Sequence, residues 1–171
     1  EYAESVAPRL GYHPYLGSPT LSVGRISGGI SVNTVPDRCT IEIDRRLLPQ
    51  EDGGAAQQDV IHFVRDRCGV EHVLHDEPFL TSPGLSDDRN KHLARALSCV
   101  AQELTQRGDL VGVPYGTDAP AFDRSGAATV VFGPGSIEQA HTNAEWVAID
   151  QLRIATQVLY EFGRRGLPAG D

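Results

Sequence analysis

The sequence predicts a protein of mixed helices and strands in two parts, an α+β part followed by an α/β part. In the first part the order of periodic segments is strand, strand, helix, strand, whereas helices and strands alternate in the second. Between them, the stretch LTSPGLSDDRN gathers serine, proline, glycine and aspartate, which is typical of a boundary. We therefore expect one domain over residues 1–80 and another over residues 81–171.

Two segments of the first part alternate between apolar and polar residues, as strands do. One is Leu21–Ile26, and the other is Cys39–Leu48, in which Cys39, Ile41 and Ile43 share one face. Such alternation is typical of a half-buried antiparallel strand. We therefore expect both segments in one sheet, with the isoleucine face covered.

Helical periodicity and short apolar runs define the remaining elements. Residues 1–10 are expected to end a helix, and residues 51–69 to form a helix that stops at Gly69. A long amphipathic helix is expected to stop at Gly108. The helices expected in the second part cover residues 87–108, 117–126 and 148–166, and the remaining strands cover residues 70–79, 110–116 and 127–135.

The composition excludes several classes of protein. A formal net charge of -8 disfavours a nucleic-acid binder, because neutralising phosphates requires a basic face. No window is apolar over the length of a membrane span, and residues 1–10 lack the features of a signal peptide. Cys39, Cys68 and Cys99 form no Cys-x-x-Cys pair, which favours reduced thiols. We expect a cytoplasmic protein that binds neither nucleic acid nor membrane.

The segment VVFGPGSIEQAHTNAEWV places a histidine soon after a predicted strand. Sites in α/β sheets gather at the carboxyl ends of strands, and Gly133 and Gly135 would let a ligand approach the backbone. His141 follows, and histidine is a common zinc ligand. One histidine is not a metal site, however, because zinc usually takes three or four protein ligands. By themselves these features favour an ordinary loop over a site.

Two other polar segments also have alternative interpretations. Asp118 in YGTDAP suits the N-cap of a helix. Arg46 in DRR either lies on a solvated strand face or uses its guanidinium fork to bind a substrate carboxylate. No Gly-x-Ser-x-Gly sequence and no Cys/His nucleophile arrangement is visible.

The order of three segments resembles one family of enzymes. GRISGGISVNTVPDRCTIEIDRRLLP, YGTDAPAF and VVFGPGSIEQAHTNAEWV are similar to segments of the co-catalytic zinc amidohydrolases and peptidases. This family includes acetylornithine deacetylase, succinyl-diaminopimelate desuccinylase, aminoacylase and glutamate carboxypeptidase. The resemblance implies a zinc-bearing α/β catalytic domain with an inserted α+β lid and dimerisation domain. Residues 1–80 would be the later part of the lid, and residues 81–171 the C-terminal part of the catalytic domain.

The resemblance also implies roles for individual residues. His141 would be the last protein ligand of a zinc pair, with Glu145 either supporting it or beginning a helix. Residues 116–118 would shape the floor of the site. Arg46 would receive the carboxylate of the substrate. The substrate-binding residues implied in this way are Arg46, Asn33, Gly135 and Ser136.

Several parts of the family's site have no counterpart in the sequence. The family uses a His-x-Asp for a ligand and a metal-bridging aspartate, and two adjacent glutamates for the general base and a further ligand. Neither pattern is present. The chain is therefore expected to be a C-terminal portion of such an enzyme, with His141 as its metal ligand, no general base of its own, and no activity when isolated.

The reaction implied by the resemblance is hydrolysis of the amide bond of an N-acyl amino acid by a deacetylase or desuccinylase. The implied cofactor is two zinc ions, with cobalt or manganese as alternatives. The expected partners are a small N-acyl amino acid or peptide substrate and a second copy of the chain, bound through the lid. A dipeptidase or carboxypeptidase of the same family, and an isolated dimerisation module without catalysis, are the alternatives.

Overall fold

The structure is a computed structural model that describes residues 1–69 and 72–167. The chain divides into two compact units. The first contains residues 1–84 together with residues 112–116, and the second contains the rest of the described chain. The first unit therefore receives a short segment from much later in the sequence. The roles expected for residues 1–80 and 81–171 as lid and catalytic domain stay predictions.

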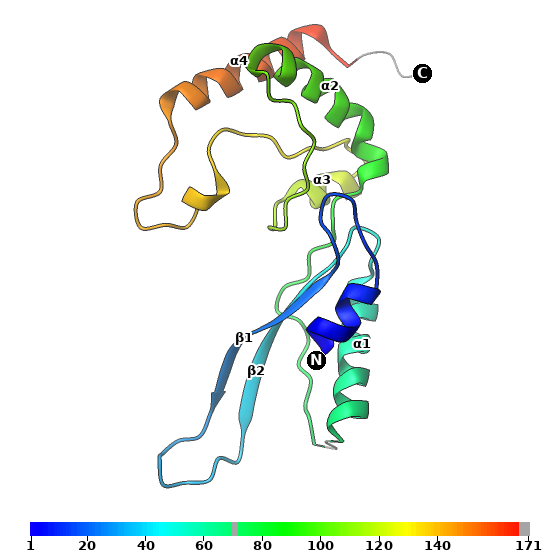
Figure 1. Cartoon of the computed structure of the whole chain (residues 1–171), viewed down its shortest axis with the longest axis vertical. Helices are drawn as coiled ribbons and strands as arrows, with labels where there is room; N and C mark the ends of the chain where they lie inside the picture. Colours follow the sequence, from blue (N-terminus) through cyan, green and yellow to red (C-terminus); the bar gives the residue numbers. More distant parts are fainter. Residues whose placement is uncertain (70–71, 168–171) are drawn as a thin grey trace. The chain divides into compact units, whose positions relative to one another are not determined.

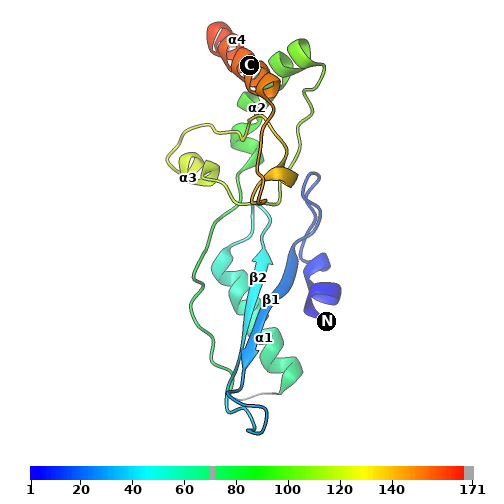
Figure 2. The same cartoon turned by 90° about the vertical axis from the view of Figure 1, so that its left-hand side faces the viewer.

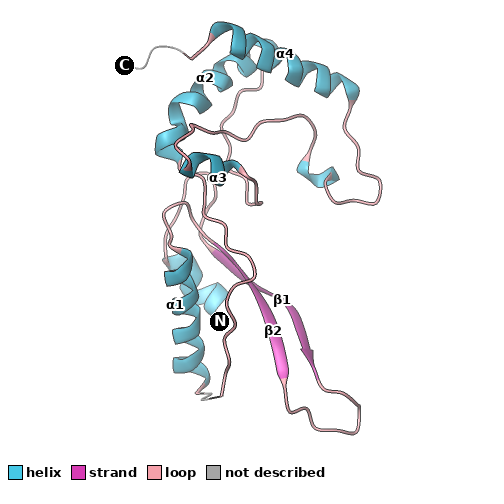
Figure 3. Cartoon of the chain, turned by 180° about the vertical axis from the view of Figure 1, so that it is seen from behind, coloured by secondary structure: helices cyan, strands magenta, loops and turns pink. Residues whose placement is uncertain are grey.

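The first unit is built on an antiparallel hairpin, drawn in Figure 1 and seen as the two magenta strands of Figure 3. Its strands are β1 (Thr20–Gly28) and β2 (Cys39–Arg46). Both strands and their common sheet confirm the prediction made from alternation. The register shifts between Val23 and Arg25, so that Gly24 forms a bulge in β1.

The face of β2 that was expected to be covered is open. Ile41 is 49% exposed and Ile43 is 37% exposed, so the expectation of a half-buried strand was wrong. Burying one face of a sheet requires further strands or a helix packed across it. The sheet has two strands in the described residues, and this leaves its apolar side chains in solvent.

Helix α1 (Gly53–Cys68) follows the hairpin and has clear signals at both ends. The Oδ1 atom of Asp52 accepts a hydrogen bond from the backbone N–H of Ala55 at 2.8 Å, which caps the first turn. The helix stops at Gly69, whose φ of +58° lies in the left-handed region that favours glycine. The predicted helix and its stop are confirmed.

The chain begins with two short helical turns where the end of a helix was expected. They are η1 (Tyr2–Val6), a π-helical turn, and η2 (Ala7–Arg9), a 3₁₀ turn. Tyr2 is buried and meets the ring of Phe63 in α1 edge-on, with 5.1 Å between the ring centroids. Aromatic pairs favour this arrangement, so the contact joins the start of the chain to α1.

The second unit is built on two long helices, α2 (Asp87–Thr105) and α4 (Ile149–Arg165), which pack together and can be followed in Figure 2. Both were predicted from their amphipathic patterns, and both are confirmed. Their buried contact contains Leu97, Val100 and Ala101 of α2 and Val158 of α4. Val158 is 1% exposed, so this apolar cluster is the core of the unit.

The long helix α2 ends earlier than expected. Its C-cap is Gln106, with a φ of +60°, and Gly108 lies beyond the helix. Gly108 is needed for a different reason, because a Cβ atom there would lie 2.5 Å from the backbone oxygen of Ser98. The glycine therefore lets the chain fold back against α2 rather than stopping the helix.

Charged side chains also join the two long helices. Arg165 of α4 reaches Glu103 of α2, with 2.7 Å between Nη1 and Oε2. Within α4, Arg164 donates to Glu161 at 2.7 Å. This hydrogen bond holds the pKa of the Glu161 carboxyl below its ordinary value, so the carboxylate stays charged over a wider pH range.

The strands expected in the second part are not formed. Residues 110–116 and 127–135 are irregular, and β1 and β2 are the strands of the described chain, as Figure 3 shows. Residues 72–79 are irregular too, while residues 70–71 lie outside the described part. A strand needs a neighbour for its backbone hydrogen bonds, and the described chain offers none to these segments. The chain is therefore a mixed α and β protein, but its second unit is helical with extended connections.

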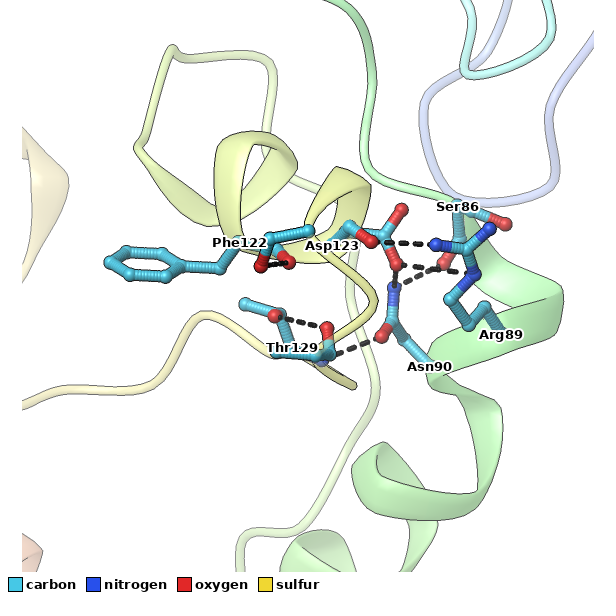
Figure 4. A network of polar contacts seen from close by, with 8 residues as sticks. Ser86, Arg89, Asn90, Phe122, Asp123 and Thr129 are labelled. Carbon is cyan, nitrogen blue, oxygen red and sulfur yellow. Dashed lines mark hydrogen bonds and ion pairs between the residues drawn. The ribbon is translucent and has the colours of Figure 1, made fainter.

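A buried asparagine joins three segments of the second unit (Figure 4). Asn90 of α2 is 3% exposed. Its Nδ2 donates to the backbone oxygen of Ser86 at 2.7 Å and to Oδ1 of Asp123 at 3.1 Å. Its Oδ1 accepts from the backbone N–H of Thr129 at 2.6 Å. Because Asp123 lies in α3 (Ala119–Arg124), one amide fixes α2, α3 and the segment that leads to residue 130.

Cys39 and Cys99 are exposed free thiols, in agreement with the prediction, whereas the side chain of Cys68 lies outside the described part. Among the helices that the structure describes, none combines the length and apolar character that crossing a membrane requires.

We predict that Asn90→Ala lowers the free energy of unfolding of the second unit by about 2–4 kcal/mol, because it leaves the buried partners of the amide without hydrogen bonds. Denaturant unfolding followed by the fluorescence of Trp146, the single tryptophan, measures the change. Asn143→Ala, at an exposed position, is the control and should change stability little. Equal stability of the two variants would contradict a central role for Asn90.

Candidate functional site

Arg46 is the last residue of β2, and its side chain is 55% exposed. Its Nη2 atom lies 2.8 Å from Oδ2 of Asp44, two residues earlier on the same face of the strand. Its Nη1 atom donates to the backbone oxygen of Pro114 at 3.2 Å. Both partners belong to the first unit. The guanidinium is therefore held at two points and still faces solvent.

The neighbouring Arg45 has the opposite environment, which the sequence did not reveal. Its side chain is 9% exposed, and its Nη2 lies 2.5 Å from Oε1 of Glu51. Oε2 of the same glutamate accepts from the backbone N–H of Leu48 at 2.6 Å. Arg45 also donates to the backbone oxygen of Arg46. The alternation of the strand thus sends Arg45 to a structural ion pair and Arg46 to solvent.

The signal for this ion pair was present in the sequence as a glutamate six residues after Arg45. It is a weak signal, because the chain must turn at Pro49 before the two side chains can meet. Strand alternation alone therefore distinguishes the two arginines, but it does not show which of them is buried.

Asn33 lies in the loop that joins β1 to β2 and is exposed. The hydroxyl of Ser31 donates to its side-chain oxygen. The loop is at one end of the hairpin and Arg46 is at the other, so the length of β2 separates them, roughly 23 Å at 3.3 Å per residue. The structure does not bring these two predicted substrate-binding residues together.

Gly135 is the last residue of the irregular segment 127–135, and Ser136 follows it. Gly135 has a φ of +96°, and its backbone N–H donates to Oε1 of Gln151 at 2.9 Å. Ser136 caps the short turn η3 (Ile137–Gln139), because its hydroxyl oxygen accepts from the N–H of Glu138 at 3.3 Å. Both residues are exposed, and both lie within six residues of His141 along the chain.

His141 occupies an uncommon backbone conformation. Its φ is +61°, in the left-handed region that non-glycine residues rarely adopt. The carboxylate of Glu145 accepts a hydrogen bond from the backbone N–H of His141 at 3.2 Å and closes the turn. Helix α4 begins at Ile149, so Glu145 does not lie at a helix start as one interpretation held. Glu145 supports His141 through the backbone.

Residues 116–118 lead into α3. Asp118 stands at the N-cap position, but its side chain makes no capping hydrogen bond. The hydroxyl oxygen of Thr117 instead accepts from the backbone N–H of Ala119 at 3.3 Å. The predicted helix start is confirmed, although no described side chain caps the first turn.

The predicted site residues are divided between the two units. Arg46 and Asn33 belong to the first, whereas Gly135, Ser136 and His141 belong to the second. Over residues 1–69 and 72–167, no three side chains of histidine, cysteine, aspartate or glutamate gather in a group that could hold a metal ion. The described residues of this chain do not form a metal site by themselves.

The fold of mixed α and β structure thus presents an exposed guanidinium at a strand end and a histidine in a strained turn. Comparison with known families identifies the class more closely. Residues 3–165 match the model of peptidase family M20/M25/M40. The chain belongs to this family, and the resemblance noted in the sequence is confirmed.

Several curated relatives carry names of amide hydrolases. A putative succinyl-diaminopimelate desuccinylase of Mycobacterium tuberculosis is 32% identical over 143 residues, which cover 83% of this chain and 37% of the relative. An acetylornithine deacetylase of Edwardsiella ictaluri is 30% identical over 86% of this chain and 38% of the relative. An N-acetyl-L-citrulline deacetylase of Xanthomonas campestris is 29% identical over 90% and 40%. The chain thus matches less than half the length of these relatives.

We predict that Glu145→Ala frees the turn at His141, because the left-handed backbone loses the hydrogen bond that holds it. Glu145→Gln keeps an oxygen acceptor and should preserve the turn. Amide hydrogen exchange at His141 is the measurement, with an expected acceleration in the alanine variant of about tenfold, which corresponds to about 1.4 kcal/mol. Slow exchange that persists in Glu145→Ala would show that other contacts hold the turn.

Proposed function

We propose that this chain is part of a metal-dependent amidohydrolase that cleaves the amide bond of N-acyl amino acids. The family match and the names of the relatives support amide hydrolysis. The observation that supports an amino-acid substrate most directly is Arg46, an exposed guanidinium fixed at the end of a strand. A guanidinium in a fixed place suits a carboxylate, which every N-acyl amino acid carries at its α-carbon.

Arg46 would contribute binding and orientation to the reaction. Its two internal hydrogen bonds use two of the five guanidinium N–H groups, and the others can meet a carboxylate. Anchoring the substrate carboxylate at Arg46 fixes the distance between Arg46 and the amide bond. The amide bond is therefore held in one position for the reaction. The substrate-binding roles that the resemblance implies for Asn33, Gly135 and Ser136 stay predictions.

The metal of the proposed enzyme would require ligands in addition to those found here. His141 is an exposed single imidazole, and the described residues add no group of donors around it. Zinc in enzymes usually has three protein ligands. The chain's own residues therefore do not fit a zinc pair, and we assign His141 no more than one ligand position. A bound metal would polarise the amide carbonyl.

A second copy of the chain is the partner that we propose for the first unit. The hairpin and its loop expose Ile26, Ile30, Val32 and Val35, each more than 70% accessible. Exposed apolar side chains beside an unpaired strand edge favour association. This observation also supports the alternative in which the first unit acts mainly in dimerisation. The remaining alternative, a dipeptidase or carboxypeptidase, differs in the substrate alone.

We predict that Arg46→Lys, made in a complete enzyme that contains this chain, lowers kcat/KM for carboxylate-bearing substrates. Lysine presents a point charge in place of a planar fork, and losing a charge-assisted pair of this kind costs about 1.5–3 kcal/mol. The measurement compares N-acetyl-L-ornithine with its neutral C-terminal amide, which should be affected much less. An equal loss for both substrates would make Arg46 structural.

A further prediction concerns the isolated chain. Residues 1–171 supplied with zinc should hydrolyse no N-acyl amino acid above background, because one imidazole cannot hold a catalytic metal ion. A metal-loaded sample is assayed with a panel of N-acyl amino acids, and His141→Ala controls for a contaminating enzyme. Turnover that disappears in His141→Ala would show that the chain carries a complete site.

A further inference from the structure

Four charged side chains meet at the end of β2 and neutralise one another. Arg45 pairs with Glu51, and Arg46 pairs with Asp44. The first pair is largely buried, whereas the second is about half exposed at both partners. Two positive and two negative charges leave no net charge at the strand end. A ligand carboxylate therefore gains little from long-range attraction here, so the position of the Arg46 donors decides how well it binds.

The position of those donors depends on two internal acceptors. Asp44 holds Nη2 of Arg46 at 2.8 Å, and the carbonyl oxygen of Pro114 accepts from Nη1 at 3.2 Å. Pro114 is well placed to act as a fixed point, because its segment is packed within the first unit. A Cβ atom at Gly112 would lie 2.7 Å from the Cβ atom of Tyr15, so the backbone there already makes a close contact.

We propose that Asp44 is a positioning residue for Arg46 in carboxylate recognition. Its carboxylate holds the guanidinium against the Pro114 carbonyl, so that the unused N–H groups meet a carboxylate in one orientation. Without Asp44, the long arginine side chain would sample several rotamers in solvent, and binding would have to order it. The substrate role of Arg46 rests on the proposed function, whereas the ordering of Arg46 by Asp44 does not.

The same strand supplies a matched control. Glu42 lies two residues before Asp44 on the same face of β2, and it pairs with Arg25 across the hairpin, with 3.0 Å between Nη1 and Oε1. Its side chain is 44% exposed and that of Asp44 is 47% exposed. Glu42→Ala thus removes an equally exposed acid and an ion pair of the same kind without touching Arg46.

The experiment measures the order of the Arg46 side chain and the binding of a carboxylate. In the full chain, ¹⁵N relaxation of the Arg46 Nε–H group is compared for the native protein, Asp44→Ala, Asp44→Asn and Glu42→Ala. Binding of N-acetyl-L-ornithine and of its neutral C-terminal amide is then titrated by chemical shift. The asparagine variant keeps an oxygen acceptor at the same place and serves as the conservative replacement.

We expect Asp44→Ala to mobilise the Nε–H group of Arg46 and to bind the carboxylate about two- to fivefold more weakly than Asp44→Asn, which has the same net charge. Asp44→Asn should retain most of the order, and Glu42→Ala should change neither quantity. Arg46 signals that are unchanged in Asp44→Ala, or equally changed in Glu42→Ala, would overturn the proposal. If Arg46 is mobilised as expected but the native chain does not prefer the carboxylate over the amide, positioning by Asp44 is supported and the substrate role of Arg46 fails.

Discussion

The buried amide of Asn90 is the constraint on which the second unit depends. An amide removed from water must keep its hydrogen bonds, and this one can do so only if α2, α3 and the segment at Thr129 hold one arrangement. The contact of Val158 with α2 holds the long helices together but does not specify where the segment after α3 leaves them. The asparagine supplies that direction, and His141 lies twelve residues beyond Thr129.

The contrast between confirmed helices and missing strands has a physical origin. A helix satisfies its own backbone, so local signals such as Asp52 and Gly69 at the ends of α1 are enough to locate it. A strand depends on a partner elsewhere in the chain, and periodicity does not reveal whether that partner is present. The hairpin formed because its two strands are neighbours in the sequence. The apolar run 127–135 has the composition of a strand but finds no partner in the described chain.

The site shows the same limit at the level of side chains. Alternation placed Arg46 and Arg45 on opposite faces of β2. The burial of Arg45 depends on its ion pair with Glu51, which reaches Arg45 only because the chain turns between them. The sequence also indicated Glu145 as a neighbour of His141. Its carboxylate accepts from the backbone N–H of His141 and not from the imidazole, because the turn gives that N–H no helical partner. Sequence spacing thus indicates which residues meet, while the conformation of the turn decides which atoms bond.

The conformation of His141 bears on whether its segment is an ordinary loop. Holding a non-glycine residue in the left-handed region costs of order 1 kcal/mol, and glycine or asparagine would adopt it with less strain. Packing of the imidazole does not offset this cost, because His141 is exposed. The described hydrogen bond of His141 is made by its backbone N–H. Within the described residues the ring makes no structural hydrogen bond, which leaves it open to the ligand role that we propose. Together with the Gly-Pro-Gly that precedes it, the strain makes His141 the residue of the second unit through which the proposed function is best tested.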